Sequence, residues 1–288
     1  MPCRFICEIG SNHNQDLKRT LKLIDEAAFI GAWAVKFQLF KAEKLYAAGF
    51  TNQIEKMKKW ELPIEFLPEI KNQCIKKNVK FICTPFYLEA IDILTHYVDY
   101  FKIGSYENEW LQLLCYVAET GKPWMISNGI NDNPIINDKY KNKLHDFCNI
   151  FPAVIFHCNS NYPADARNCN LWQIPRMKRL ISKPIKVGWS DHTVSPAVIY
   201  RAVALGAEYI EFHFDLDDTD GFESSVGHCW QARQISKVIA NVFDGDLAEQ
   251  KNTMNDSEAK KWKTDSADGL RPLIEYRGEL LDGLKMEK

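Results

Sequence analysis

Residues 185–213 read IKVGWSDHTVSPAVIYRAVALGAEYIEFH and contain one complete strand–helix–strand unit. The short apolar runs Ile185–Gly188 and Glu208–His213 are typical of strands, and the apolar spacing of Pro196–Leu205 between them predicts a helix. Two strands that are joined through a helix run parallel to each other. This unit therefore predicts an α/β fold with a parallel sheet.

The same alternation of short apolar runs and helical patterns repeats along the rest of the chain. The predicted strands are Arg4–Glu8, Trp33–Gln38, Val79–Thr84, Asp99–Ile103, Pro123–Ser127, Ala153–Cys158, Ile185–Gly188 and Glu208–His213. The predicted helices are Leu17–Ile30, Pro63–Lys77, Leu88–His96, Trp110–Thr120, Pro196–Leu205 and Gln231–Phe243. Eight such strands close a TIM (β/α)8 barrel, whose site lies at the carboxyl ends of the strands. The alternative is an open doubly wound sheet, which is disfavoured because no G-x-G-x-x-G motif follows the first strand.

Two segments fall outside the barrel pattern. Leu39–Leu62 is a long, Lys-rich connection after the second strand, and connections of this length are typical of lids or binding loops. We expect residues 1–244 to form the barrel as one catalytic domain. Residues 245–288 form a polar tail that we expect to be helical or partly ordered.

Charge and composition exclude several classes of protein. The 288 residues carry 36 basic and 38 acidic side chains, whereas a nucleic-acid-binding protein shows a basic excess. No apolar run reaches the roughly 20 residues of a membrane span, and the N-terminus lacks the pattern of a signal peptide. The nine cysteines form no C-x-x-C pair, which predicts buried, reduced thiols. The sequence therefore predicts a cytoplasmic protein with no nucleic-acid or membrane partner.

Lysines inside two predicted strands are the first functional signal. Lys36 lies in the second strand and Lys102 in the fourth, and a lysine in a barrel interior is costly unless an anion pairs with it. Hydroxyl groups lie near the ends of several strands, at Thr84, Ser105, Ser127 and Ser190. Together these groups predict a cradle for a small phosphorylated carboxylate.

Two histidines at adjacent strand ends are the second signal. His192 follows the seventh strand and His213 ends the eighth, so we expect the two imidazoles to share one metal ion. Neutral imidazole with oxygen ligands suits Mn²⁺, Zn²⁺ or Fe²⁺, and an open site of this kind acts as a Lewis acid on a carbonyl. Taken singly, each histidine also fits a structural role in the core or at a helix cap. His157 and His228 are expected to be structural or to support the ligands.

Seven short motifs follow one another along the barrel. They are EIGSNHN (8–14), AVKFQ (34–38), TPF (84–86), FKIGS (101–105), HCNSNYP (157–163), GWSDHT (188–193) and IEFHF (210–214). In this order they resemble the sialic acid (N-acetylneuraminate) synthase family, and the match runs from about residue 4 to residue 214. That family condenses phosphoenolpyruvate with an amino-sugar aldehyde to a nine-carbon 3-deoxy-2-keto acid, on a TIM barrel with a divalent metal. The resemblance therefore implies phosphoenolpyruvate and an aldose as substrates, a homodimer, and Mn²⁺ as the metal, with Mg²⁺, Co²⁺ or Zn²⁺ as alternatives.

The resemblance also implies roles for individual residues. It assigns the metal to His192 and His213. It places Glu8 at the acceptor hydroxyls, Glu107 at the water that attacks C2, and Lys102 among the catalytic groups. The residues implied to bind substrate are Lys36, Gln38, Thr84, Lys102, Ser105, Ser127, Asn161 and Ser190.

Two departures from the family's pattern bear on the acceptor sugar. After His213 the family usually has a Pro-Gly-Pro-Asp-His stretch, whereas residues 215–228 here read DLDDTDGFESSVGH. Glu223 and Ser224 stand where the Asp-His pair would be, and His228 is nearby. We also expect the family's C-terminal antifreeze-like domain to be absent. These departures leave the acceptor open, whether N-acetylmannosamine or another sugar.

Two alternatives to the synthase remain. The first is a catalytically altered family member that acts as a sugar-binding, phosphate-binding or assembly subunit. The second is a metal-dependent aldolase or epimerase on the same barrel, which would share the metal site and not the phosphate cradle.

Overall fold

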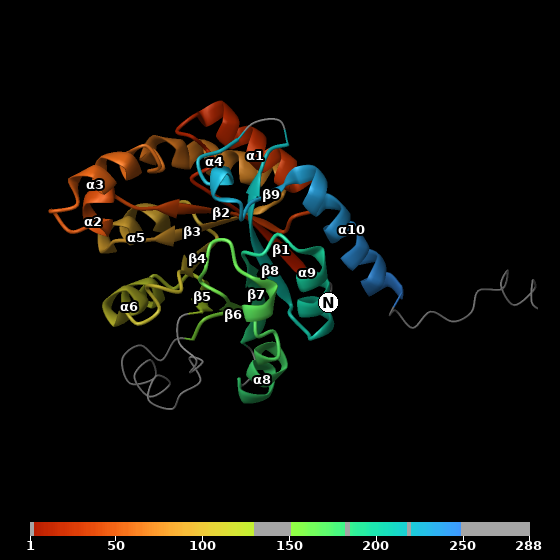
Figure 1. Cartoon of the computed structure of the whole chain (residues 1–288). Helices are drawn as coiled ribbons and strands as arrows, with labels where there is room; N and C mark the ends of the chain where they lie inside the picture. The colour runs from red at the N-terminus through yellow and green to blue at the C-terminus, as the bar shows by residue number, and fades with distance from the viewer. Residues whose placement is uncertain (1–2, 130–150, 182–184, 218–219, 249–288) are drawn as a thin grey trace, which may run out of the picture. The chain divides into compact units, whose positions relative to one another are not determined.

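Eight parallel strands form a closed barrel, because β1 pairs with both β2 and β8 (Figure 1). The computed structural model describes residues 3–129, 151–181, 185–217 and 220–248. The barrel strands are β1 (Arg4–Gly10), β2 (Ala34–Leu39), β3 (Lys80–Pro85), β4 (Tyr100–Ile103), β5 (Trp124–Asn128), β6 (Val154–Cys158), β7 (Lys186–Asp191) and β8 (Tyr209–Asp215). A short additional strand, β9 (Trp230–Gln231), pairs with the carboxyl end of β8. The closed ring confirms the predicted TIM barrel and excludes the open doubly wound sheet.

Helices follow most of the strands and cover the outside of the barrel (Figure 1). They are α1 (Leu17–Phe29), α2 (Ala42–Leu45), α3 (Thr51–Lys58), α4 (Leu67–Lys77), α5 (Leu88–Thr95), α6 (Leu111–Glu119), α8 (Gln173–Leu180), α9 (Pro196–Ala204) and α10 (Ala232–Ala248). All six predicted helices are present. α8 lies outside the predictions, because its sequence contains a proline and only two buried positions, Ile174 and Met177.

Several elements differ in extent from the predictions. β7 continues to Asp191, so Ser190 lies within the strand instead of after it. The connection over residues 39–62 contains α2 and α3, two short helices that the sequence pattern does not predict. The predicted tail, residues 245–288, lies outside the described residues except for the end of α10.

The barrel interior has two layers with different chemistry. Apolar side chains form one buried cluster. Its members on the strands include Ile6, Ala34, Ile82, Met125 and Tyr209. Because successive residues of a strand point to opposite faces, the side chain two positions further along points to the same side. Those further positions carry Glu8, Lys36, Thr84, Ser127 and Glu211. One alternation thus fills the amino-terminal part of the interior with apolar groups and gathers polar groups towards the carboxyl ends.

Gly188 makes room for an aromatic ring inside the barrel. Gly188 pairs with Phe156 in the β6–β7 register. A Cβ at position 188 would lie 2.6 Å from two ring carbons of Phe156 and 2.9 Å from the backbone oxygen of Tyr209. The Phe156 ring in turn lies 5.1 Å from the Nζ atom of Lys102, so it borders the polar layer.

A second, larger apolar cluster surrounds the strands. Among its buried members are the cysteines Cys3, Cys7, Cys74, Cys83 and Cys169. These thiols fill the core between strands and helices, as the sequence predicts for cysteines within apolar runs.

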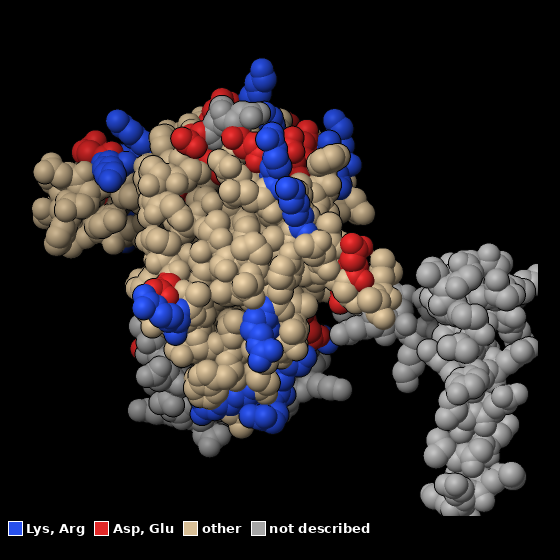
Figure 2. All heavy atoms as spheres, turned by 45° about the vertical axis from the view of Figure 1, so that its right-hand side comes forward, with Lys and Arg blue, Asp and Glu red and all other residues tan. Residues whose placement is uncertain are grey.

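The outer surface shows charges of both signs. Figure 2 shows one face, on which Lys, Arg, Asp and Glu side chains are interspersed around a broad area with few charges. Among the helices of the described residues, none has both the length and the hydropathy needed to cross a membrane.

Candidate active site

Two lysines and two glutamates form a buried charge cluster in the polar layer. Lys36 Nζ lies 3.0 Å from Glu8 Oε2 and 3.1 Å from Glu211 Oε1. Lys102 Nζ lies 3.4 Å from the same Glu211 oxygen. All four side chains are buried. The chain itself thus supplies the anions that buried lysines require, and with all four groups charged the cluster is neutral.

Burial and pairing act in opposite directions on the pKa values of this cluster. Burial lowers the pKa of Lys102, although Glu211 opposes the shift. Burial would do the same at Lys36, but Glu211 and Glu8 outweigh it and raise its pKa. Burial raises the pKa of Glu8, whereas Lys102 and Lys36 overcome burial at Glu211 and hold its pKa at about 2. The positive charge of Lys102 is therefore less well neutralised by carboxylates than that of Lys36. An incoming anion is stabilised most strongly beside Lys102.

Two predicted hydroxyl groups contact the cluster directly. Lys102 Nζ donates a hydrogen bond to Ser127 Oγ at 2.6 Å. Ser190 Oγ donates to Glu211 Oε1 at 3.0 Å. Both serines are buried, so two hydroxyl groups contact the cluster inside the barrel.

Glu8 joins the lysines to the histidines through the strand register. β1 lies between β2 and β8, and Glu8 is paired with Lys36 on one side and His213 on the other. Gln38 Nε2 donates to Glu8 Oε1 at 2.7 Å, and Gln38 is itself in register with the buried Thr84. The closure of the barrel therefore brings residues from both ends of the barrel sequence into one site.

Three predicted residues lie further towards the rim. Ser105 is buried, with its Oγ 2.9 Å from Ser160 Oγ. Glu107 is partly exposed, burial raises its pKa, and its carboxylate fills the space that a Cβ on Gly104 would occupy. Asn161 is exposed, and among the described residues its side chain has no hydrogen bond to the others, so its substrate contact stays a prediction.

His192 and His213 lie together, with one nitrogen of each ring already bound. Their ring centres are 5.4 Å apart. His192 Nδ1 lies 2.6 Å from the backbone oxygen of Asn159, and His213 Nδ1 lies 2.7 Å from Glu223 Oε2. An acceptor oxygen at Nδ1 places the ring hydrogen there and leaves a lone pair on Nε2. Within the described part of the chain neither Nε2 atom has a hydrogen-bond partner, so both are available as metal ligands.

The electrostatic surroundings of the two histidines differ. Burial, with the neighbouring His213, lowers the pKa of His192 to about 3, so His192 is neutral at physiological pH. Burial would also lower the pKa of His213, but the Glu223 carboxylate outweighs it and raises that pKa. The neutral form of imidazole is the one that binds a metal.

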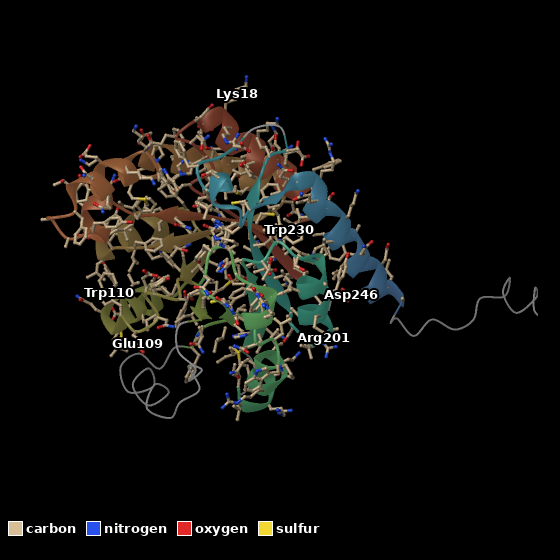
Figure 3. All side chains as sticks on the ribbon, viewed as in Figure 1. Lys18, Glu109, Trp110, Arg201, Trp230 and Asp246 are labelled. Carbon is tan, nitrogen blue, oxygen red and sulfur yellow. The ribbon has the colours of Figure 1, made fainter. Side chains whose placement is uncertain are left out.

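Asp191 fixes the end of β7 next to His192. Its Oδ1 atom accepts from Trp189 Nε1 at 3.2 Å and from Thr193 Oγ1 at 2.7 Å. Its Oδ2 atom accepts from Nε1 of Trp230, at 3.2 Å; Trp230 belongs to β9 and is labelled in Figure 3. The two tryptophans therefore hold the strand end from which His192 projects.

The loop between β8 and β9 brings further ligand-type side chains to His213. The ligating atoms of His213, Glu223, His228 and Cys229 lie within 4.8 Å of one another, which makes a group suited to a metal among the described residues. Glu223 Oε1 also accepts the backbone N–H of Ser11 at 2.8 Å. The loop that departs from the family's pattern thus lies directly against the predicted metal ligand.

Glu211 and Tyr162 belong to this site and are absent from the predicted site residues. Glu211 lies two positions before His213 on β8, so the strand alternation was a usable signal for it. The ring centre of Tyr162 lies 4.0 Å from that of His192 and 5.5 Å from that of His213. Tyr162 follows β6 in a loop, and no local pattern indicates that its ring reaches the histidines.

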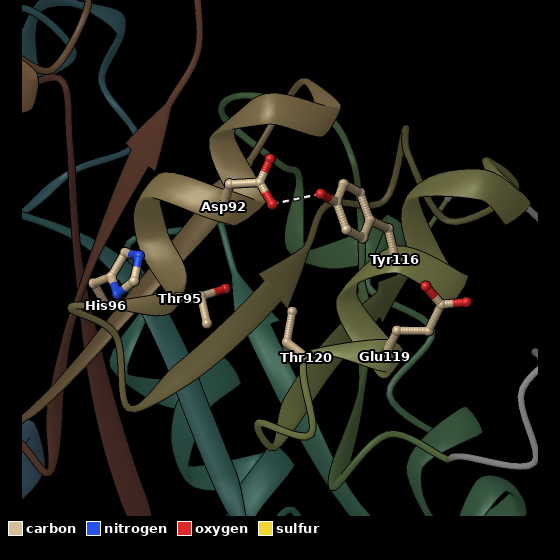
Figure 4. A pocket seen from close by; sticks show the side chains of 6 residues that line it. All are labelled: Asp92, Thr95, His96, Tyr116, Glu119 and Thr120. Carbon is tan, nitrogen blue, oxygen red and sulfur yellow. Dashed lines mark hydrogen bonds between the residues drawn. The ribbon is translucent and has the colours of Figure 1, made fainter.

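A separate surface hollow lies outside the barrel, between α5 and α6 (Figure 4). Its volume is about 430 Å³, and Tyr116 donates a hydrogen bond to Asp92 across it. The lining residues are Asp92, Thr95, His96, Tyr116, Glu119 and Thr120. None of the predicted site residues lines this hollow, so the candidate active site is the polar layer of the barrel.

Comparisons with known proteins find similarity to one protein family. Residues 23–251 match the NeuB family. An uncharacterized protein of Methanocaldococcus jannaschii is 37% identical over 217 residues, which cover 75% of this chain and 63% of that protein. The N,N'-diacetyllegionaminic acid synthase of Campylobacter jejuni is 32% identical over 272 residues, 86% of this chain and 81% of the synthase. The chain thus spans less than two thirds of the first of these relatives.

A solved structure shows the same fold. The crystal structure of N-acetylneuraminic acid (sialic acid) synthetase from Leptospira borgpetersenii superposes with a TM-score of 0.77 at 26% sequence identity. The superposition covers 94% of this chain and 93% of the synthetase chain.

Proposed function

This chain belongs to the NeuB family, and we propose that it condenses phosphoenolpyruvate with a sugar aldehyde to a 3-deoxy-2-keto sugar acid and inorganic phosphate. Relatives are named as synthases of diacetyllegionaminic acid, pseudaminic acid and N-acetylneuraminate 9-phosphate. Because these named products differ, we propose the class of acceptor, an amino-sugar aldose, and do not assign one particular sugar. The observation that carries it is the buried lysine–glutamate cluster beside the histidine pair.

In this proposal the lysines bind phosphoenolpyruvate. Lys102 is the principal cation, because its only carboxylate neighbour within 4 Å among the described residues is shared with Lys36. The hydroxyl groups of Ser127 and Ser190, both within hydrogen-bond distance of the cluster, supply further contacts for phosphate or carboxylate oxygens. Lys36 keeps Glu8 as a partner when the anion binds, so the cluster stays paired in both states.

His192 and His213 would hold a divalent metal, Mn²⁺ in this proposal, with Mg²⁺, Co²⁺ or Zn²⁺ as alternatives. The fit rests on the two Nδ1 atoms, which are both engaged with oxygen acceptors and so leave both Nε2 atoms for the metal. When bound, the metal supplies Lewis-acid polarisation of the acceptor carbonyl.

The remaining groups orient the substrates and move protons. C3 of phosphoenolpyruvate bonds to the aldehyde carbon, and a water molecule then adds at C2. Glu107 receives the proton of that water, since its raised pKa brings the carboxylate closer to the pH at which a general base is effective. The C2 hydroxyl then becomes the ketone as the C–O bond to phosphate breaks, with the electron pair leaving on phosphate. The hydroxyl proton passes to the alkoxide formed from the aldehyde oxygen, and Glu107 gives the proton that it took from water to the departing phosphate. Glu8 and Gln38 hold acceptor hydroxyls, and Lys102 neutralises the departing phosphate.

Phosphate release tests the proposal. The purified protein is incubated with phosphoenolpyruvate, Mn²⁺ and a panel of N-acetylated and phosphorylated aldoses, and we expect release with at least one acceptor. Lys102→Met should abolish release. Lys186→Met is the matched control, because Lys186 pairs with Glu208 at 2.8 Å on the surface, and it should retain full activity. No release with any acceptor, together with no phosphoenolpyruvate binding by calorimetry, would overturn the proposal.

A further inference from the structure

The loop between β8 and β9 places a fixed carboxylate behind one of the two histidines. Glu223 Oε2 lies 2.7 Å from His213 Nδ1, and Glu223 Oε1 accepts the backbone N–H of Ser11 at 2.8 Å. A Cβ at Gly10 would overlap the Glu223 carboxylate, so glycine at this position makes room for it. Both oxygens of this buried carboxylate are therefore held in place, one by the backbone after β1 and one by His213.

Two arrangements of a metal are compatible with these side chains. In the first, the Nε2 atoms of His192 and His213 bind the metal and Glu223 stays hydrogen-bonded behind His213. In the second, His213, Glu223, His228 and Cys229 share one metal, since their ligating atoms lie within 4.8 Å of one another. If the metal used His213 Nδ1, the second arrangement would break the 2.7 Å contact between Glu223 and His213.

We propose that Glu223 is a positioning residue in the first arrangement, where it accepts the Nδ1–H of His213 and keeps the Nε2 lone pair for the metal. The inference rests on the metal site of the proposed function. His192 has the same construction with another acceptor, since its Nδ1 lies 2.6 Å from the backbone oxygen of Asn159. Histidine ligands commonly donate their second N–H to a carboxylate or carbonyl oxygen, and a carboxylate also makes the ring a stronger ligand.

Glu223→Gln tests this role, because the two side chains have nearly the same shape. The amide oxygen of glutamine can still accept the N–H of Ser11, and its NH2 group then faces His213 Nδ1. His213 can accept from that group only with its hydrogen on Nε2, which removes the lone pair that the metal needs. We expect the Kd for Mn²⁺, measured by isothermal titration calorimetry, to rise about 10- to 100-fold. An unchanged Kd overturns the proposal.

Cys229→Ser is the matched control within the same loop. Asn12 Nδ2 lies 3.5 Å from Cys229 Sγ, and a serine hydroxyl can also accept from it. We expect this variant to bind Mn²⁺ with an unchanged Kd. We also expect the Co²⁺-loaded wild-type protein to show no thiolate-to-cobalt charge-transfer absorption. Such a band in the wild type, lost in Cys229→Ser, would place the metal in the four-residue group and overturn the proposal.

The outcomes separate this inference from the proposed function. Circular dichroism checks that Glu223→Gln is folded; if it is not, Glu223→Asp, which is one methylene shorter, takes its place with the same expected direction. If the wild type releases phosphate but Glu223→Gln binds Mn²⁺ with the wild-type Kd, the inference alone is rejected. If Glu223→Gln raises the Kd for Mn²⁺ but the wild type releases no phosphate, the proposed function alone is rejected. A wild-type protein that binds neither Mn²⁺ nor Co²⁺ overturns the inference.

Discussion

Glu211→Gln removes the carboxylate that contacts both buried lysines. Its Oε1 atom lies 3.1 Å from Lys36 Nζ and 3.4 Å from Lys102 Nζ. At an effective dielectric constant of about 20, each contact provides about 5 kcal/mol of attraction. The variant also avoids the desolvation of one buried charge, which offsets several kcal/mol, and it relieves the repulsion with Glu8. We expect the free energy of unfolding to fall by about 3–5 kcal/mol, as when one partner of a buried ion pair is removed.

Glu208→Gln is the matched control for this variant. Glu208 also contacts two lysines, Lys178 at 3.7 Å and Lys186 at 2.8 Å, but its side chain is 32% exposed. A surface pair of this kind contributes about 1 kcal/mol or less. Urea unfolding followed by circular dichroism measures both variants against the wild type. A loss at Glu211 no larger than the loss at Glu208 would refute the assignment of a buried, coupled charge cluster.

Inorganic phosphate gives the same variant a second readout. In Glu211→Gln the two lysines keep only Glu8, so the cluster carries one net positive charge instead of none. We therefore expect phosphate to raise the Tm of this variant by more than it raises the Tm of the wild type. An equal shift in both proteins would show that phosphate binds elsewhere.

Three further variants test separate parts of the structure. Gly188→Ala should lower the free energy of unfolding by about 1–3 kcal/mol, because its Cβ would overlap the Phe156 ring, and adding Phe156→Leu should recover part of the loss. Burial lowers the pKa of His13 from 6.5 to about 4. Between these pH values His13 is protonated in the unfolded chain and neutral in the folded chain, so the free energy of unfolding should fall as the pH drops from about 6.5 to 4. His13→Asn, which keeps an acceptor for the backbone N–H of Gln15, should remove about 3 kcal/mol of that fall in urea titrations at successive pH values. Asp16→Ala should cost about 1 kcal/mol in thermal unfolding without changing phosphate release, because the Asp16 side chain caps α1 by accepting the backbone N–H groups of Lys18 and Arg19.

The barrel could be predicted because its strands carry a strong local signal. Each of the eight predicted strands overlaps an observed one, since a parallel sheet that is buried on both faces needs short apolar runs. The strand ends were less accurate, because polar residues such as Ser190 continue β7 where a local pattern reads as a turn. Helices with few buried positions, such as α3, gave too weak a periodicity to be found.

The site could be predicted only in part, because its contacts join distant parts of the chain. Lys36 and Lys102 stood out because lysine is costly inside a strand. Glu211 shares a strand face with His213, but its lysine partners could not be predicted, because they lie on β2 and β4 and meet it across the barrel interior, where no strand pairing joins them to β8. Glu223 shows the limit most clearly, because its carboxylate meets Ser11, 212 positions earlier in the chain, and no local pattern encodes that contact.

The charge cluster also changes what the buried lysines mean. A lysine inside a barrel indicates an anion, but that anion need not be a substrate, and Lys36 already has both Glu8 and Glu211 within 3.1 Å. Lys102 differs, because the shared Glu211 oxygen, at 3.4 Å, is its only carboxylate contact among the described residues, and its short contact is with the neutral hydroxyl of Ser127. A purely structural pair would favour equal sharing of the carboxylates, since an undercompensated buried cation destabilises the fold. The unequal sharing leaves positive charge on the Lys102 side of the cluster, where an anionic substrate would be stabilised, and this asymmetry supports a substrate site more strongly than the presence of the lysines.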